Sequence, residues 1–194
     1  ELPGRMGGGV CVLDADGAPP MDLFFALRGQ THLYAATATL AFVERTAEMG
    51  LDVVGSAMGC LAFDAEGDSD DDLLVTDVGS VRLFLREGDR FVEEDLGLRL
   101  DPRDMYTSSA AGDLDDDGDV DLVVAGNIRF DRTRIDPMCG GCCAGKVALH
   151  DAIPSLLLRR ESDGSYTEAA AVLAPDLALD ETTLVVAITD LDAD

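Results

Sequence analysis

Positive charge is scarce in this chain of 194 residues, which has 14 lysines and arginines against 39 aspartates and glutamates. The formal net charge at pH 7 is −25. Such a charge argues against nucleic acid and anionic membrane surfaces as partners, and favours bound cations or an acidic, solvated surface. The chain also lacks an apolar run of the roughly 18 residues that a transmembrane helix needs. No signal peptide is recognisable at its start, so we expect one to have been removed or to lie outside this sequence.

Familiar catalytic signatures are missing too. The sequence contains no nucleophile motif, no phosphate-binding loop and no HExxH helix. Five cysteines are too few for a disulfide scaffold, but three of them cluster at Cys139, Cys142 and Cys143. We expect Cys139 to form a disulfide with one of the other two. A zinc or copper site that includes His150 is the alternative.

Cys11 and Cys60 lie on equivalent predicted strands, one position out of register. Because side chains alternate between the two faces of a sheet, we expect these cysteines to face opposite ways. Buried free thiols are the expected state. A bond from one of them to the remaining cysteine of the cluster is the alternative.

The most informative stretch is an acidic loop at residues 113–121. Carboxylates occupy its first, third, fifth, seventh and ninth positions, and Gly118 occupies the sixth. This spacing is typical of an EF-hand-like calcium loop, because calcium takes about six to eight oxygen ligands and a tight turn must direct short acidic side chains inward. An apolar run of strand type follows at once in place of a helix. The sequence therefore predicts a strand-loop-strand calcium site with the ligands Asp113, Asp115, Asp117, Asp119 and Asp121.

The same frame recurs at residues 14–22 and 64–72, and begins again at 190–194. The predicted ligands are Asp14, Asp16, Pro20 through its carbonyl, and Asp22 in the first loop; Asp64, Glu66, Asp68, Asp70 and Asp72 in the second; and Asp190, Asp192 and Asp194 in the partial copy. We expect the lowest affinity in the first loop, where Ala18 replaces a carboxylate. We expect a strained or wider turn in the second loop, where Ser69 stands in place of glycine. About three structural calcium sites are predicted, since a filled oxygen cage leaves no open position for a substrate.

The spacing of these loops indicates a repeat. Their first aspartates lie 50, 49 and 77 residues apart. A period near fifty residues is typical of four-stranded propeller blades. We predict units at residues 6–55, 56–104 and 105–180, the start of another at 181–194, and an insertion loop at 128–153. The expected strands are 10–13, 23–26, 32–36 and 40–44; 60–63, 73–76, 81–86 and 90–94; 108–112, 122–126, 156–160 and 165–168; and 183–189.

Several of these segments resemble a known repeat. Gly8-Gly9-Val10 leading into the first loop, then Leu33-Tyr34 and the run from Phe42 to Leu51, are similar to the FG-GAP or VCBS repeat. The most similar variety is that of the cartilage acidic protein and UnbV group. The resemblance implies a seven-bladed, calcium-binding β-propeller. Such propellers serve adhesion, scaffolding and, in some proteins, enzymatic activity.

The expected fold over residues 1–194 is therefore all-β, with about three propeller blades and the start of a fourth. Because about four blades are the minimum for closure, a longer chain or a second chain would supply the remaining blades. We expect a non-enzymatic, calcium-stabilised adhesion module that holds a protein or glycan partner, with residues 128–153 as the candidate contact. The alternatives are the scaffold of an extracellular enzyme acting on polysaccharide, and a copper- or redox-handling protein that uses the cysteine cluster.

An extracellular, cell-surface or periplasmic location is expected. Weak calcium loops need calcium near the millimolar range, which is the level found outside cells.

Overall fold

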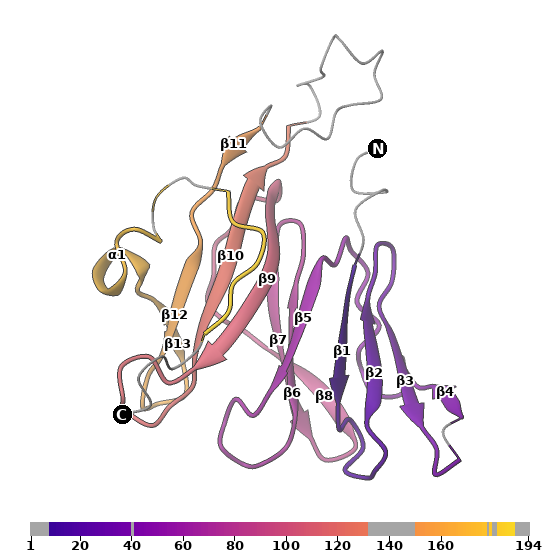
Figure 1. Ribbon diagram of the computed structural model, residues 1–194. Helices are drawn as coiled ribbons and strands as arrows, with labels where there is room; N and C mark the ends of the chain where they lie inside the picture. The colour runs from indigo at the N-terminus through magenta and orange to yellow at the C-terminus, as the bar shows by residue number, and fades with distance from the viewer. Residues whose placement is uncertain (1–7, 40, 132–149, 178, 180–181, 189–194) are drawn as a thin grey trace, which may run out of the picture.

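The computed structural model describes residues 8–39, 41–131, 150–177, 179 and 182–188. These residues form three antiparallel sheets and one short helix, α1 (Ala170–Leu173) (Figure 1). Within each of the first two sheets, strands that follow one another in the chain are hydrogen-bonded neighbours. The all-β prediction is confirmed at this level.

Sheet 1 consists of β1 (Gly9–Leu13), β2 (Asp22–Ala26), β3 (His32–Ala36) and β4 (Phe42–Glu44). Sheet 2 consists of β5 (Gly59–Phe63), β6 (Asp72–Thr76), β7 (Val81–Glu87) and β8 (Arg90–Glu94). Sheet 3 consists of β9 (Asp104–Gly112), β10 (Asp121–Arg129), β11 (Asp151–Ala152), β12 (Leu156–Arg160) and β13 (Tyr166–Glu168).

The strands of sheets 1 and 2 lie where the sequence predicts them, with ends that differ by no more than two residues. In sheet 3, β9 and β10 are longer than expected, because shifts of register near Gly126 let the pairing continue to Arg129 opposite Asp104. Beyond Gly126, β10 also pairs with β11. The described ends of the segment predicted as an insertion loop, residues 128–153, are thus paired strands, and residues 132–149 lie outside the described part of the chain.

One predicted strand, 183–189, is not formed over its described residues. This segment lies along sheet 3, where the Thr183 amide donates to the Gly126 carbonyl at 2.9 Å. The Thr107 hydroxyl contacts the carbonyls of Thr183 and Leu184. Val186 and Ile188 pack with Leu157. The segment is held by one backbone hydrogen bond and by side-chain contacts, whereas a strand requires a continuous backbone ladder.

Two apolar layers hold the three sheets together. Phe24 and Leu33 of sheet 1 pack with Leu73, Val75 and Phe84 of sheet 2. The second layer joins the other face of sheet 2 to sheet 3, and its buried members include Leu74, Leu83, Leu122, Val124 and Leu158. Side chains alternate between the two faces of a strand, and sheet 2 is covered on both faces. The strand β6 is therefore buried at every position.

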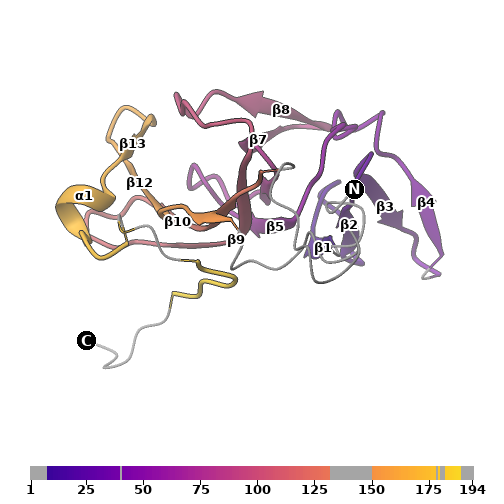
Figure 2. The ribbon, with the colours of Figure 1, turned by 90° about the horizontal axis from the view of Figure 1, so that it is seen from above.

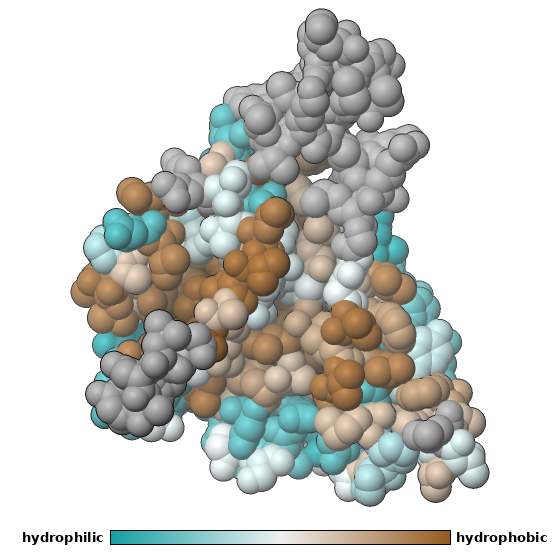
Figure 3. Space-filling view, viewed as in Figure 1, coloured by the Kyte–Doolittle hydropathy of each residue, from teal (hydrophilic) through white to brown (hydrophobic). Residues whose placement is uncertain are grey.

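Among the described residues, the outer face of sheet 1 has no such cover. Its cross-strand row consists of Val12, Leu23 and Tyr34. Val12 is 57% exposed, and hydrophobic side chains gather over β1 and β2 in Figure 3. The residues at the same repeat positions in sheet 2, Leu73 and Phe84, are buried against sheet 1. Sheet 1 therefore presents to solvent the face that sheets 2 and 3 bury.

A disulfide joins Cys11 of β1 to Cys60 of β5, with their Cα atoms 6.0 Å apart. The prediction of free thiols at these positions is therefore wrong. The two cysteines do face opposite ways relative to their own sheets. However, sheets 1 and 2 stack with opposite faces in contact, so residues on opposite faces of equivalent strands point toward each other. β1 and β5 also approach closely, since a methyl group added at Gly9 would lie 2.9 Å from the Gly59 Cα.

Seen from above, the sheets lie side by side in chain order and, over the described residues, close no ring (Figure 2). Within the same residues, no helix is long and apolar enough to cross a membrane.

Candidate functional site

Three acidic loops lie at one end of the sheets, at the bottom of Figure 1. The first loop (14–22) joins β1 to β2, the second loop (64–72) joins β5 to β6, and the third loop (113–121) joins β9 to β10. Each loop thus connects the first two strands of its sheet, as the sequence predicts. Because neighbouring sheets have these loops at the same end, the loops also lie next to one another.

The first aspartate of each loop folds the backbone around its own carboxylate. Asp14 Oδ1 accepts the amides of Gly17 and Ala18 at 2.7 and 3.0 Å. Asp64 Oδ1 accepts the equivalent amides of the second loop at 2.7 and 3.1 Å. Asp113 accepts the amides of Asp117 and Gly118 at 3.2 and 2.9 Å. These are side-chain-stabilised turns, a conformation that aspartate favours.

These turns need left-handed backbone at the fourth position of each loop. The φ angles there are +76° at Gly17, +76° at Gly67 and +61° at Asp116. Ser69 also has φ +72°. The second loop therefore keeps the path of the glycine-containing turn, and Ser69 adopts a conformation that is costly for a residue with a Cβ. The expectation of strain at Ser69 agrees with this angle.

The last aspartate of each loop, Asp22, Asp72 or Asp121, is at most 1% exposed and ties the loop to its sheet. One carboxylate oxygen accepts the amide of the second loop residue, at 3.0, 2.7 and 3.0 Å respectively. The other oxygen accepts an amide from β3, β7 or β12, namely that of Ala36, Arg86 or Arg160, at 2.7, 2.8 and 2.9 Å. The same hydrogen-bonded frame is therefore built three times.

Burial makes the carboxylates of Asp22 and Asp72 reluctant to ionise. Desolvation raises the pKa of Asp72 to about 6, against the opposing effect of the amides of Arg86 and Ala65, and the charges of Glu66 and Asp68 add to the rise. Burial likewise raises the pKa of Asp22. A nearby cation would favour the charged forms of both groups.

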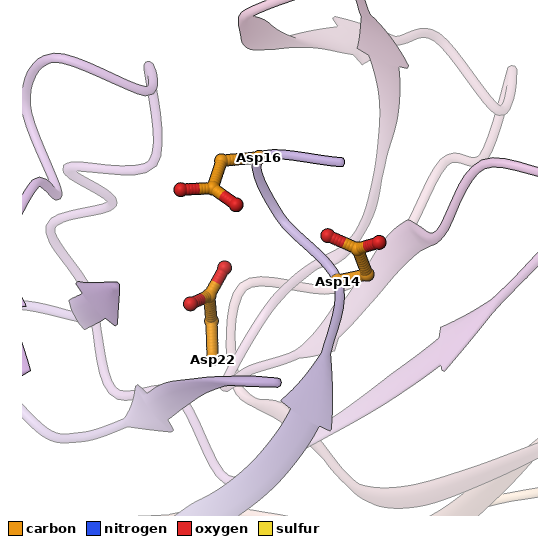
Figure 4. Close-up of side chains that lie close together, drawn as sticks. All are labelled: Asp14, Asp16 and Asp22. Carbon is orange, nitrogen blue, oxygen red and sulfur yellow. The ribbon is translucent and has the colours of Figure 1, made fainter. Parts of the chain in front are cut away.

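Three carboxylates converge in the first loop. Asp14, Asp16 and Asp22 each offer an oxygen, and these oxygens lie within 4.8 Å of one another. Figure 4 shows the carboxylates of Asp16 and Asp22 pointing toward each other across the loop, with Asp14 at its start. Pro20, whose carbonyl is a predicted ligand, follows Pro19 through a cis peptide bond. The loop with the fewest carboxylates in the sequence thus brings three of them together.

In the third loop, Asp113, Asp115 and Asp117 also converge, each with an oxygen within 4.8 Å of those of the other two. Desolvation, and then the charge of Asp117, raise the pKa of Asp115. Asp119 donates its amide to Asp117 Oδ1 at 2.9 Å. Three of the five predicted ligands therefore converge, and the buried Asp121 anchors the loop.

The second loop differs from the other two. Among the described residues, the converging groups of three are those of the first and third loops. Asp70 is paired with the Arg86 guanidinium at 2.8 Å, a shorter contact than the 3.4 Å between Arg45 and Asp16 of the first loop. Glu66 and Asp68 are exposed. In this loop, therefore, a carboxylate is neutralised by an arginine of the protein itself.

A divalent, oxygen-seeking cation fits the chemistry of the first loop. Its three converging groups are carboxylates, the ligands that calcium prefers. Asp16 Oδ1 is buried and, in the described structure, has no hydrogen-bond partner. A buried carboxylate oxygen without a partner is unfavourable, and a bound cation would satisfy it. Calcium binding by the predicted ligands of all three loops stays a prediction.

Some predicted site residues lie outside the described part of the chain. They are the partial fourth loop and the cysteine cluster, namely Asp190, Asp192, Asp194, Cys139, Cys142 and Cys143. Two contacts from the second repeat to the first loop were missed by sequence reasoning. The Asp14 amide donates to Asp71 Oδ2 at 2.7 Å, and the Arg86 guanidinium lies against Gly17. No sequence signal for either contact exists within a single repeat, because both contacts join residues of different repeats.

Comparison with known proteins gives one match. Residues 64–124 match the family of the FG-GAP-like repeat. The matched segment begins at the first residue of the second loop, covers β6 to β8 of sheet 2, β9 and the third loop, and ends in β10. No curated protein matches the chain. An FG-GAP-like repeat is therefore present at residues 64–124, and it contains two of the three acidic loops.

Proposed function

We propose that this protein is a calcium-stabilised interaction module of the extracellular space, in which calcium fastens the loop end of each sheet. The observation that supports this proposal most is the threefold repetition of one hydrogen-bonded frame around acidic loops. In the first and third loops, that frame holds three carboxylates within 4.8 Å of one another. Like charges at such distances repel unless a cation lies between them.

The role proposed for calcium is structural. The residues that would hold it are the predicted ligands of the three loops, and the ion would supply charge neutralisation and oxygen coordination. Asp22, Asp72 and Asp121 already use both carboxylate oxygens to tie loop to strand. Fixing these loops would stabilise each hairpin and its contact with the next sheet.

We further propose that the three sheets are successive blades of one β-propeller. Each sheet has its loop at the same end and packs its face on the next sheet through equivalent residues. The open face of sheet 1, formed by Val12, Leu23 and Tyr34, would then be covered by another sheet of the same repeat. The support is that the same positions in sheets 2 and 3 are covered in this way.

An extracellular setting is supported by two observations. Disulfides such as Cys11–Cys60 persist in oxidising compartments. FG-GAP-like repeats are typical of extracellular, adhesion-related modules. We propose a protein or glycan as the partner.

Thermal unfolding in calcium chloride and in EDTA tests the proposal. A ligand present at about 100 times its Kd stabilises the folded state by about 2.7 kcal/mol, so calcium should raise Tm by several degrees. Asp16→Asn is the informative variant, since it weakens a converging carboxylate and should reduce this shift. Asp52→Asn is the matched control, because Asp52 is exposed and outside the loops.

A Tm that is equal in calcium and EDTA would contradict the proposal. So would metal analysis that finds zinc or copper in place of calcium after purification.

A further inference from the structure

The first loop has fewer carboxylates of its own than the other two loops. Ala18 stands at its fifth position, where the second and third loops have Asp68 and Asp117. A carboxylate of the second repeat nevertheless lies against the first loop, because the Asp14 amide donates to Asp71 Oδ2 at 2.7 Å. The first residue of the converging group is therefore held by a neighbouring repeat.

Asp14 is thus fixed through both its backbone and its side chain. Asp71 holds the backbone amide, and Asp14 Oδ1 accepts the amides of Gly17 and Ala18 at 2.7 and 3.0 Å. Hydrogen bonds that orient a ligand before the metal ion arrives strengthen binding, and loss of such a partner typically lowers metal affinity by about 10- to 100-fold. The contact to Asp71 can therefore affect cation binding without direct contact with the ion.

The second repeat holds Asp71 in place with its own groups. On one side, Asp70 is paired with the Arg86 guanidinium at 2.8 Å. On the other side, Asp72 accepts the amides of Ala65 and Arg86 at 2.7 and 2.8 Å. Both neighbours of Asp71 are thus fixed by hydrogen bonds within the protein, so Asp71 is ordered without an ion in the second loop.

Arg86 also packs the two loops against each other. A methyl group added at Gly17 would lie 2.9 Å from Arg86 Nη2, so the guanidinium contacts the first loop. The Arg86 side chain is only 8% exposed, and its charge is paired with that of Asp70. This contact therefore supports the first loop without adding an unpaired positive charge that would repel a cation.

The next pair of loops has the arginine contact but lacks the carboxylate. Arg160 stands at the position of Arg86, and its guanidinium donates to the Ala65 carbonyl of the second loop. Val120 stands at the position of Asp71 and has no side-chain acceptor. Among the described repeats, the additional carboxylate thus lies beside the loop that lacks one at its fifth position.

We propose that Asp71 is a positioning residue for the cation site of the first loop, so that this site is built by two repeats. Asp71 holds the Asp14 amide and thereby keeps the Asp14 carboxylate in the converging group with Asp16 and Asp22. This inference rests on the proposed binding of calcium to the first loop. It does not depend on an ion in the second loop.

Titration of the whole chain with calcium chloride, followed by two-dimensional amide NMR, tests the proposal. Gly17 reports on the first loop and Gly118 on the third, since each donates its amide to the first aspartate of its own loop. Asp71→Val is the informative variant, because the third loop has valine at this position. We expect it to raise the Kd read at Gly17 about tenfold or more, and to leave the Kd at Gly118 unchanged.

Asp71→Asn separates the hydrogen bond from the charge, because it keeps an oxygen acceptor for the Asp14 amide. Its Kd at Gly17 should stay close to that of the unmodified protein. Asp52→Asn is the matched control for the lost charge, since Asp52 is exposed and outside the loops. In the calcium-free protein, Asp71→Val should move the Asp14 amide resonance further than Asp71→Asn does.

The outcomes separate the two proposals. If Gly17 and Gly118 respond to calcium but Asp71→Val leaves the Kd at Gly17 unchanged, or raises both Kd values equally, the positioning role is refuted and the proposed function stands. An Asp71→Asn variant as weak as Asp71→Val would also refute it, because the charge would then be the cause. If neither glycine responds in the unmodified protein, both proposals fail.

A dispersed amide spectrum shows that each variant is folded. If Asp71→Val loses that dispersion, Asp71→Ala takes its place with the same expected Kd values.

Discussion

Asp77 shows how a single buried carboxylate affects the stability of this protein. It lies between β6 and β7 and is 4% exposed. Its Oδ1 accepts the amides of Ser56 and Val78, and Gly55 lies against its Oδ2. Burial raises the pKa of Asp77 above its usual value, against the opposing effect of these hydrogen bonds. The charged form is therefore less favourable in the folded state than in the unfolded chain.

The sign of the pH dependence follows from this shift. Between the unfolded pKa and the higher folded pKa, the folded protein binds more protons, so the free energy of unfolding falls as pH rises through that window. Asp77→Asn keeps the Oδ1 acceptor and removes the charge. We expect this variant to have a higher Tm than the unmodified protein at pH 7, and the difference to shrink as pH falls below about 4.

Thermal unfolding between pH 3.5 and 7.5 measures this difference, with Asp52→Asn as the exposed control. A destabilised Asp77→Asn variant at pH 7 would show that the charge of Asp77 contributes favourably. If the difference in Tm did not change with pH, titration of Asp77 would not be its cause.

At the scale of the element, the disulfide joins the first strands of two sheets. Cys11 and Cys60 are 49 residues apart in the chain. Closing a loop of this size by a disulfide typically stabilises a protein by about 2 to 4 kcal/mol. At the equivalent positions between sheets 2 and 3 stand Leu61 and Ser109, so that interface is held by packing and by hydrogen bonds such as that from the Gly79 amide to the Asp104 carbonyl at 2.7 Å. The described structure thus has one cross-linked and one non-covalent interface.

We expect the double variant Cys11→Ser, Cys60→Ser to lose about 2 to 4 kcal/mol in chemical denaturation. Hydrogen exchange should rise mainly in β1 to β4, because sheet 1 is held to the rest of the described structure through this interface. Reductant should lower the Tm of the unmodified protein by more than that of the double variant. An unchanged Tm after complete reduction, verified by thiol labelling, would refute the expectation.

At the scale of the whole molecule, the three sheets differ in what covers them. Leu23 and Leu73 occupy the same position in successive repeats, and each pairs with an aromatic residue on the next strand. Leu73 is fully buried, whereas Leu23 lies on the open face of sheet 1. The two leucines therefore form a matched pair that differs only in the neighbouring sheet.

We expect Leu73→Ala to cost about 2 to 5 kcal/mol of unfolding free energy, because it removes buried methyl groups and leaves a cavity. Leu23→Ala should cost less than about 1.5 kcal/mol, because its side chain already contacts solvent. Denaturant unfolding at low protein concentration compares the two. Equal costs would mean that the outer face of sheet 1 is covered in solution.

The sequence alone determined the elements of this protein. The alternation of apolar residues placed twelve of the observed strands, because strand formation in an antiparallel repeat depends on local pattern and on the turns. The spacing of Asp14, Asp64 and Asp113 located the three loops for the same reason, since each loop is closed by hydrogen bonds within its own repeat. Segments between residues 8 and 51 also resemble the FG-GAP repeat, the family that matches residues 64–124.

Only the tertiary structure decided how one repeat meets the next. The Cys11–Cys60 bond, the Asp71 contact to Asp14 and the Arg86 contact to Gly17 each join residues of different sheets. Such contacts depend on which faces stack and at what offset, and the alternation pattern of one strand contains no information on either. The open face of sheet 1 is a result of the same kind, because Leu23 and Leu73 are the same residue in the same local pattern and only the neighbouring sheet distinguishes them.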